Sequence, residues 1–274
     1  MKAHLDLLTY SGRQEFIKGN FTGALEIYNR CIEYNPADGR AWLGIARIYW
    51  KTGGARRAAL AEKAYKDGLS YNPKNPYLLQ AYAVMLVKLG QLKEAQKLLI
   101  GSVKSNPSHA ASWCTLADIN FRNGDIGTAR FCYSSAVEND PQSYVALQAW
   151  GQLESNKRWG DPSKARSLFR RAILVSGNQS VHSYHAWAIL ERREGDLNES
   201  QRLLNTALEL FPRSTRVLLA LAELTEMRGG RSREATEKVR RIFKEGFDTA
   251  VAIGDAGFVQ VDRDSYCQRA CYGR

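Results

Sequence analysis

The sequence predicts an all-α chain built from one repeated helix-turn-helix unit. Pro73, Pro107 and Pro141 are each separated by 34 residues, and Pro141 to Pro212 spans two such units plus three residues. A period of 34 residues punctuated by proline is typical of helical solenoids. Alignment on these prolines gives seven units, which begin at Leu5, Gly39, Pro76, Ala110, Tyr144, Val181 and Thr215.

The first helix of each unit is predicted from large apolar residues three apart, followed directly by a small residue. Because residues spaced three and four apart share one face of a helix, they form an apolar stripe, and the small residue lets a second helix cross closely. The early large residues are Leu8, Trp42, Leu79, Trp113, Leu147, Tyr184 and Leu218. The small residues are Gly12, Ala46, Ala83, Ala117, Gly151, Ala188 and Ala222.

In six of the seven units the second helix is predicted after a glycine, where a left-handed helix end is accessible without strain. These glycines are Gly19, Gly53, Gly90, Gly124, Gly195 and Gly229. The second helix carries a small residue near its start, at Ala24, Ala61, Ala95, Ala129, Ala165, Ser200 and Ala235. A bulky residue follows four positions later, at Tyr28, Tyr65, Leu99, Tyr133, Phe169, Leu204 and Val239. Proline then ends this helix. The extra residues of longer units are expected in the inter-helix turns, in GGARRA, WGDPSKA and RGGRSREA.

The pattern resembles tetratricopeptide repeats (TPR) over residues 5 to about 248, best in YAVMLVKLGQLKEAQKLL and WCTLADINFRNGDIGTARFCY. Later units are similar to half-a-TPR (HAT) repeats, through WGQLE at Trp150–Glu154 and WAILE at Trp187–Glu191. The resemblance implies a right-handed α-solenoid of about seven repeats in residues 1–248. Residues 249–274 are expected to form a capping helix and tail, since a solenoid needs a cover at its ends.

The composition narrows the class of protein. No apolar run approaches the roughly 18 residues of a membrane span, and the first residues lack a signal or transit character. Five scattered cysteines indicate free thiols in a reducing, intracellular compartment. Residues 1–149 and 150–245 each carry 18 Lys/Arg against 12 Asp/Glu, so the net charge of +11 is spread along the chain. A distributed positive field suits an elongated binding surface.

The sequence gives little support for a catalytic site or a metal site. No Ser/His/Asp or Cys/His set is indicated by spacing, and the glycine pairs lack the Lys that completes a phosphate loop. His182 and His185 have a metal-compatible spacing, and Cys267 and Cys271 another, but neither pair has further ligands nearby. We therefore expect no enzyme activity, no cofactor, no metal and no small-molecule substrate.

The partner-binding surface is predicted on the first helices, which line the inner face of TPR stacks. Its candidate residues are mostly basic, amide or aromatic: Arg13, Arg40, Arg47, Trp50, Lys51, Tyr77, Lys88, Arg122, Gln152, His185, Arg192, Arg193 and Arg216. A merely solvated helix face is the alternative interpretation. Trp42, Trp113, Trp150 and Trp187 fall at repeat-core positions, so packing is favoured over base stacking, whereas Trp50 and Trp159 are better candidates for partner contact.

Two functions remain open. The TPR resemblance implies a non-catalytic scaffold that holds protein subunits or RNA within a larger assembly through a basic concave face. The HAT resemblance implies, as the alternative, a sequence-selective factor that binds single-stranded RNA for RNA maturation or stabilisation in the plastid stroma or nucleus. The Lys/Asn clamp with which some TPR proteins bind chaperone C-termini is not matched, because Thr9, Arg13 and Gly44 hold the corresponding positions.

Overall fold

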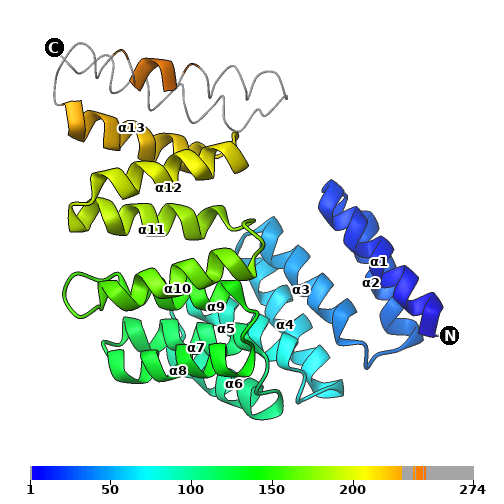
Figure 1. Ribbon diagram of the computed structural model, residues 1–274. Helices are drawn as coiled ribbons and strands as arrows, with labels where there is room; N and C mark the ends of the chain where they lie inside the picture. Colours follow the sequence, from blue (N-terminus) through cyan, green and yellow to red (C-terminus); the bar gives the residue numbers. More distant parts are fainter. Residues whose placement is uncertain (1, 230–236, 238, 243, 245–274) are drawn as a thin grey trace. The chain divides into compact units, whose positions relative to one another are not determined.

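The computed structural model describes residues 2–229, 237, 239–242 and 244, and every regular element in these residues is an α-helix (Figure 1). The chain divides into two compact units, one ending at Pro141 and one beginning at Gln142. The first unit contains α1 (Lys2–Lys18), α2 (Phe21–Tyr34), α3 (Gly39–Thr52), α4 (Ala55–Tyr71), α5 (Pro76–Lys88), α6 (Leu92–Ser105), α7 (Ala110–Arg122) and α8 (Ile126–Asn139). The second contains α9 (Tyr144–Glu154), α10 (Pro162–Val175), α11 (Val181–Glu194), α12 (Leu197–Leu210) and α13 (Thr215–Gly229).

The helices of the first unit pair into four repeats, as the sequence predicts. Each odd-numbered helix packs on the even-numbered helix that follows it, and α2, α4 and α6 each also contact the next repeat. The odd-numbered helices α1, α3, α5 and α7 contact one another in succession. They therefore form one continuous face of this unit, and side chains on that face from neighbouring repeats can act together.

The second unit continues the same architecture with repeats five and six and the first helix of repeat seven. The helix α9 pairs with α10, and α11 pairs with α12, while α13 packs on both helices of repeat six. The predicted starts of repeats two to seven coincide with the observed starts of α3, α5, α7, α9, α11 and α13. The expected cap and tail at 249–274 and most of the last predicted helix lie outside the described residues.

The predicted turn chemistry accounts for the helix ends. After α7, Gly124 takes a φ of +82°, which a side chain would strain. Asp125 then caps α8 by accepting a hydrogen bond from the backbone N–H of Thr128. At the other end of α8, Pro141 lies two residues beyond the last helical residue, where it prevents continuation.

Close helix crossings form the core of each repeat. The small residue of the second helix is fully buried in the six repeats where it is described: Ala24, Ala61, Ala95, Ala129, Ala165 and Ser200. The bulky residue four positions later is also buried in every repeat: Tyr28, Tyr65, Leu99, Tyr133, Phe169, Leu204 and Val239. The pairing of small and large residues predicted from the sequence is therefore confirmed.

One prediction about the insertions is wrong. The three extra residues of repeat two do not enlarge the turn, because only Gly53 and Gly54 separate α3 from α4. Instead α4 has 17 residues, against 14 in α2 and α6. Its first turn, ARRA, contains good helix formers, so extending the helix satisfies the backbone at less cost than a longer loop.

Candidate partner-binding surfaces

All thirteen residues predicted to bind a partner lie on the odd-numbered helices. Three of them, Trp50, His185 and Arg192, are half-buried. The other ten are exposed: Arg13, Arg40, Arg47, Lys51, Tyr77, Lys88, Arg122, Gln152, Arg193 and Arg216. The structure brings some of them together in two grooves, one in each compact unit.

The first groove lies between α1 and α3 and has a volume of about 670 Å³. It contains three of the predicted residues, Arg13, Arg40 and Arg47, and we call it the N-terminal groove. Its lining also includes Asp6, Thr9, Tyr10, Phe16, Ile17, Tyr28, Leu43 and Gly44. Sequence reasoning placed the basic residues here, but it did not identify the tyrosine of α2 that reaches the groove floor.

The three arginines of the N-terminal groove differ in their partners. Arg40 forms ion pairs with Asp6 at 2.7 Å and with Asp38 at 2.8 Å. Asp38 also caps α3 through the backbone N–H of Arg40, so this arginine is held by its own repeat. By contrast, Arg13 and Arg47 form no hydrogen bond or ion pair with any residue that the structure describes. Both of these arginines are exposed.

Tyr28 lies between two glycines at the base of this groove. A methyl group built on Gly12 would stand 2.9 Å from the tyrosine ring, and one built on Gly44 would overlap it. Tyr28 is 6% exposed. Burial raises the pKa of its hydroxyl, and the positive charges of Arg47 and Arg13 oppose that rise. The repeat's small positions therefore fix the ring and leave its hydroxyl under the influence of both arginines.

Other predicted residues of the first unit take part in local contacts. The Nζ atom of Lys51 lies 4.9 Å from the ring centroid of Phe16 and 5.3 Å from that of Phe21, a geometry that favours cation–π attraction. The ring of Tyr77 meets that of His109 edge to face, with centroids 4.7 Å apart. Tyr77 nevertheless remains 58% exposed, so it can still contact a partner.

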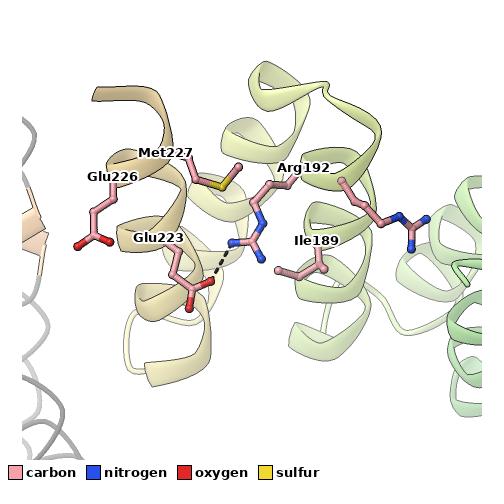
Figure 2. A pocket seen from close by; sticks show the side chains of 6 residues that line it. Ile189, Arg192, Glu223, Glu226 and Met227 are labelled. Carbon is pink, nitrogen blue, oxygen red and sulfur yellow. Dashed lines mark hydrogen bonds and ion pairs between the residues drawn. The ribbon is translucent and has the colours of Figure 1, made fainter. Parts of the chain in front are cut away.

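The second groove lies between α11 and α13 (Figure 2) and is lined by Ile189, Arg192, Arg193, Glu223, Glu226 and Met227. Arg192 points across it and forms a 2.8 Å ion pair with Glu223 (Figure 2). Arg193 turns away to Glu194, at 2.9 Å, and to the backbone carbonyl of Ser155. The two arginines are thus balanced by carboxylates, and this groove is mixed in charge where the sequence predicted a basic surface.

A basic cluster extends along α11 to α13. The guanidinium of Arg216 lies 3.0 Å from Nδ1 of His182. Burial lowers the pKa of His185, and the charges of Arg216, His182 and Arg192 lower it further, while Glu223 opposes them.

Within the described residues there is no group of three or more His, Cys, Asp or Glu side chains that could hold a metal ion. Cys267 and Cys271 lie outside the described residues.

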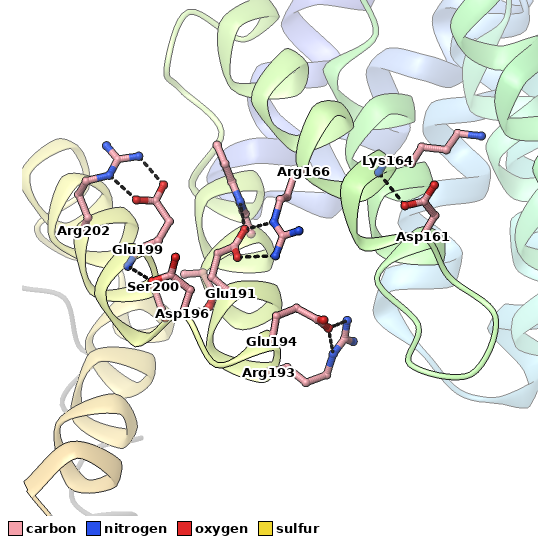
Figure 3. A network of polar contacts seen from close by, with 12 residues as sticks. Asp161, Lys164, Arg166, Glu191, Arg193, Glu194, Asp196, Glu199, Ser200 and Arg202 are labelled. Carbon is pink, nitrogen blue, oxygen red and sulfur yellow. Dashed lines mark hydrogen bonds and ion pairs between the residues drawn. The ribbon is translucent and has the colours of Figure 1, made fainter.

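The HAT-like signatures have a structural role that sequence reasoning did not assign. In repeat six, Trp187 donates its indole N–H to Glu191 at 2.7 Å, and Arg166 of repeat five donates two hydrogen bonds to the same carboxylate, at 2.7 and 2.9 Å. Figure 3 shows Arg166 and Glu191 meeting between the two repeats. In repeat five, Trp150 donates to Glu154 at 3.0 Å. The Glu four residues after each Trp was the available signal, because that spacing places both on one helix face.

The tryptophans predicted in the core mostly lie at its edge. Trp187 is 7% exposed, whereas Trp42, Trp113 and Trp150 are half-buried. The indole N–H groups of Trp42 and Trp113 donate to the carbonyl oxygens of Pro36 and Pro107, both at 2.8 Å. Trp50 and Trp159 are also half-buried. Their proposed contact with a partner stays a prediction.

The structure defines an α-helical repeat protein whose odd-numbered helices line two grooves. Models of the tetratricopeptide repeat match residues 16–76, 54–113 and 110–143. These matches together span residues 16–143, so this part of the chain consists of tetratricopeptide repeats. No helix in the described part of the chain has the length and apolar character needed to cross a membrane.

Several curated proteins are similar in sequence. The chain is 26% identical over 237 residues to the PsbB mRNA maturation factor Mbb1, chloroplastic, of Chlamydomonas reinhardtii, covering 80% of this chain and 35% of that protein. It is 27% identical over 113 residues to protein high chlorophyll fluorescent 107 of Arabidopsis thaliana, covering 41% and 17%. It is 28% identical over 154 residues to mouse tetratricopeptide repeat protein 21A, covering 54% and 11%. The chain thus spans about a third or less of the length of these relatives.

Solved structures share the fold. Yeast Tom70 aligns with a TM-score of 0.71 at 18% identity, over 97% of this chain and 54% of that chain. Pseudomonas aeruginosa pilF aligns with a TM-score of 0.60 at 16% identity, over 81% of this chain and 98% of that chain. At this level of identity, the likeness establishes a helical repeat architecture and carries no information on partners.

Proposed function

We propose that the chain is a non-catalytic scaffold that holds protein subunits of a larger assembly on the surface of its odd-numbered helices. The observation that carries this proposal is the N-terminal groove, where Arg13 and Arg47 lack carboxylate partners among the described residues. Tyr10 and Ile17, which are 60% and 64% exposed, lie along the same groove. Charged donors beside exposed apolar side chains are typical of surfaces that bind proteins.

The test is a pull-down from the source cells with nuclease-treated extract. We expect wild-type protein to retain partner proteins after nuclease treatment, and the double variant Arg13→Gln/Arg47→Gln to lose most of one of them. The matched control is Arg56→Gln/Arg57→Gln, because these two exposed arginines lie on α4, away from the groove. If nuclease removes every partner of the wild-type protein, the protein-scaffold proposal is wrong.

A second candidate is a factor that binds single-stranded RNA, which is motivated by the Chlamydomonas relative that is named an mRNA maturation factor. The similarity to it covers 80% of this chain, which favours this candidate over a generic repeat match. Arg13 and Arg47 would then contact phosphates. Each phosphate neutralised on a single strand lowers log K by about 0.7 per log unit of salt, so two contacts predict a slope of about −1.4.

Titration of labelled single-stranded RNA at several salt concentrations tests the second candidate. RNA binding predicts a dissociation constant tighter than about 10 µM at low salt. It also predicts that Arg13→Gln/Arg47→Gln flattens the salt dependence for all RNA sequences alike. Absence of such binding leaves the protein scaffold. A plastid stromal location would accompany the RNA function by analogy with the same relative, and a nuclear location by the HAT resemblance.

A further inference from the structure

The hydroxyl of Tyr28 faces a groove that offers it no acceptor. Its side chain lines the N-terminal groove and is 6% exposed, yet no described residue accepts a hydrogen bond from it. Gly12 and Gly44 pack closely against the ring from two helices, and this packing fixes the orientation of the ring. The hydroxyl oxygen itself is not sealed from solvent, so water in the groove can accept its hydrogen bond until a ligand replaces that water.

The groups around this hydroxyl are donors. Arg13 and Arg47 line the same groove, and a guanidinium has five N–H donors and no acceptor. Three donor groups from α1, α2 and α3 therefore converge on one place. The ligand that completes such a set is an anion with several acceptor lone pairs, of which a carboxylate is the commonest in proteins.

Repeat four has a hydrogen-bond acceptor at the position that corresponds to Arg13 of repeat one. By repeat alignment, Asp118 and Tyr133 correspond to Arg13 and Tyr28. The hydroxyl of Tyr133 donates to the carboxylate of Asp118 at 2.5 Å. In repeat one that carboxylate is replaced by arginine, which turns an internally satisfied tyrosine into one that needs an acceptor from outside the repeat.

The rest of the groove limits the kind of ligand. Ile17 and Tyr10 are exposed and Phe16 and Leu43 are half-buried, so an apolar surface adjoins the donors. Asp6 also lines the groove, where it pairs with Arg40 and keeps one carboxylate close to any occupant. RNA has no aliphatic side chain to place against Ile17 and Leu43. A peptide segment can place a carboxylate beside the donors and a neighbouring aliphatic side chain against these two residues.

We propose that the N-terminal groove binds an extended acidic segment of a protein partner, with one Asp or Glu carboxylate held by Tyr28, Arg13 and Arg47 and a neighbouring apolar side chain against Ile17 and Leu43. This proposal rests on the scaffold function proposed above and names the ligand chemistry of one of its sites. The ligand is an internal side-chain carboxylate, so it requires no free chain end.

The probe is a fluorescein-labelled, amidated peptide with the repeating composition Glu-Leu-Glu-Ile, and its control has Gln in place of each Glu. We expect the full chain to bind the acidic peptide at least about tenfold more tightly than the Gln peptide, as loss of charge-assisted hydrogen bonds predicts. Tyr28→Phe should weaken binding of the acidic peptide only, while Arg56→Gln on α4 should leave it unchanged. Equal binding of both peptides would overturn the proposal.

A double-mutant cycle locates the carboxylate. If Arg47 contacts it, Arg47→Gln and the Glu-to-Gln change in the peptide should each weaken binding, but together by less than the product of the two effects. Independent, multiplicative effects would show that the carboxylate binds elsewhere. Because each variant is compared through a peptide ratio, a general loss of fold would lower both peptides alike and would be visible in helical circular dichroism.

Two further titrations distinguish a failure of this proposal from a failure of the proposed scaffold function. Inorganic phosphate and a single-stranded RNA oligonucleotide are titrated against wild type and Tyr28→Phe. RNA binding that is tighter than peptide binding and lost in Arg13→Gln/Arg47→Gln would assign the site to RNA and overturn the peptide proposal. If instead the nuclease-resistant partners persist in that double variant, the scaffold function stands and this groove is not their site.

Discussion

Repeats one to four and repeats five and six share the same packing of a small residue and a bulky residue in the second helix. Their polar side chains, however, form different contacts. In the first group, Trp42 and Trp113 donate to the carbonyls of preceding turns, and Arg13 and Arg47 have no carboxylate partner in the part of the chain that the structure describes. In the second group, Trp150 and Trp187 donate to buried glutamates. In the second group Arg166 and Arg192 form ion pairs with Glu191 and Glu223, whereas in the first group Arg40 is paired and Arg13 and Arg47 are exposed. The same packing rule therefore accommodates different arrangements of the charged side chains.

The largest loss of stability is expected for substitution of Glu191, one of the buried glutamates that distinguish the second group. The carboxylate is 3% exposed and is shared by Trp187 and Arg166, so Glu191→Leu should lower the free energy of unfolding by about 2–4 kcal/mol. Glu191→Gln, which can still accept from the indole, should cost less. Urea denaturation followed by circular dichroism measures both. Glu194→Gln is the control, because its surface pair with Arg193 should be worth less than about 1 kcal/mol.

A second change tests the rule that both groups share. Ala129 is fully buried at the crossing of α7 and α8, and Ala165 is fully buried at the corresponding place in repeat five. Ala129→Leu and Ala165→Leu should each overpack the crossing and cost about 1–3 kcal/mol. Chemical denaturation should show similar losses for both. An unchanged midpoint for either variant would contradict the repeat alignment at that position.

The paired tyrosines of repeats one and four should respond differently to the same substitution. Tyr133→Phe removes a hydrogen bond to Asp118 and should cost about 1–2 kcal/mol. Tyr28→Phe removes no hydrogen bond to a described residue, so we expect a change within about 0.5 kcal/mol. Parallel urea titrations provide the comparison. Equal losses would show that the Tyr28 hydroxyl is satisfied in the free protein.

The smallest effect concerns two histidines, one in each compact unit. Burial lowers the pKa of His109, and burial together with Arg216 lowers that of His185. For a base with a lowered folded pKa, the unfolded chain binds more protons, so stability is fully present above about pH 6.5 and falls as pH decreases below it. His109→Gln and His185→Gln should each flatten this decline.

Salt should distinguish the two histidines. The pH dependence of stability that His185 causes should weaken at high salt, because salt screens the charges of Arg216 and Arg192. The pH dependence that His109 causes should persist, because burial alone lowers the pKa of His109. Denaturation midpoints measured from pH 5 to 8 at low and high salt test this difference. The same salt response at both positions would contradict the assigned causes.

The repeat architecture could be predicted because packing acts locally and with a fixed period. The 34-residue spacing placed the starts of α3, α5, α7, α9, α11 and α13 correctly, and it put Arg13, Arg47 and Arg192 on odd-numbered helices. It could not show that Arg192 pairs with Glu223, since rotamers of long side chains on neighbouring helices decide such contacts. The role of Tyr28 was equally hidden, because it depends on glycines from two other helices and on the missing carboxylate of its own repeat.

The bond between Arg166 and Glu191 crosses the boundary between repeats five and six, and this has a consequence for how such a chain can change over evolutionary time. A repeat that meets its neighbours only through apolar faces can be duplicated or deleted as one module. Removal of repeat five would leave the Glu191 carboxylate buried without its cation, and removal of repeat six would leave Arg166 without its anion. Loss of either repeat alone therefore carries a cost that a purely apolar boundary between repeats would not impose.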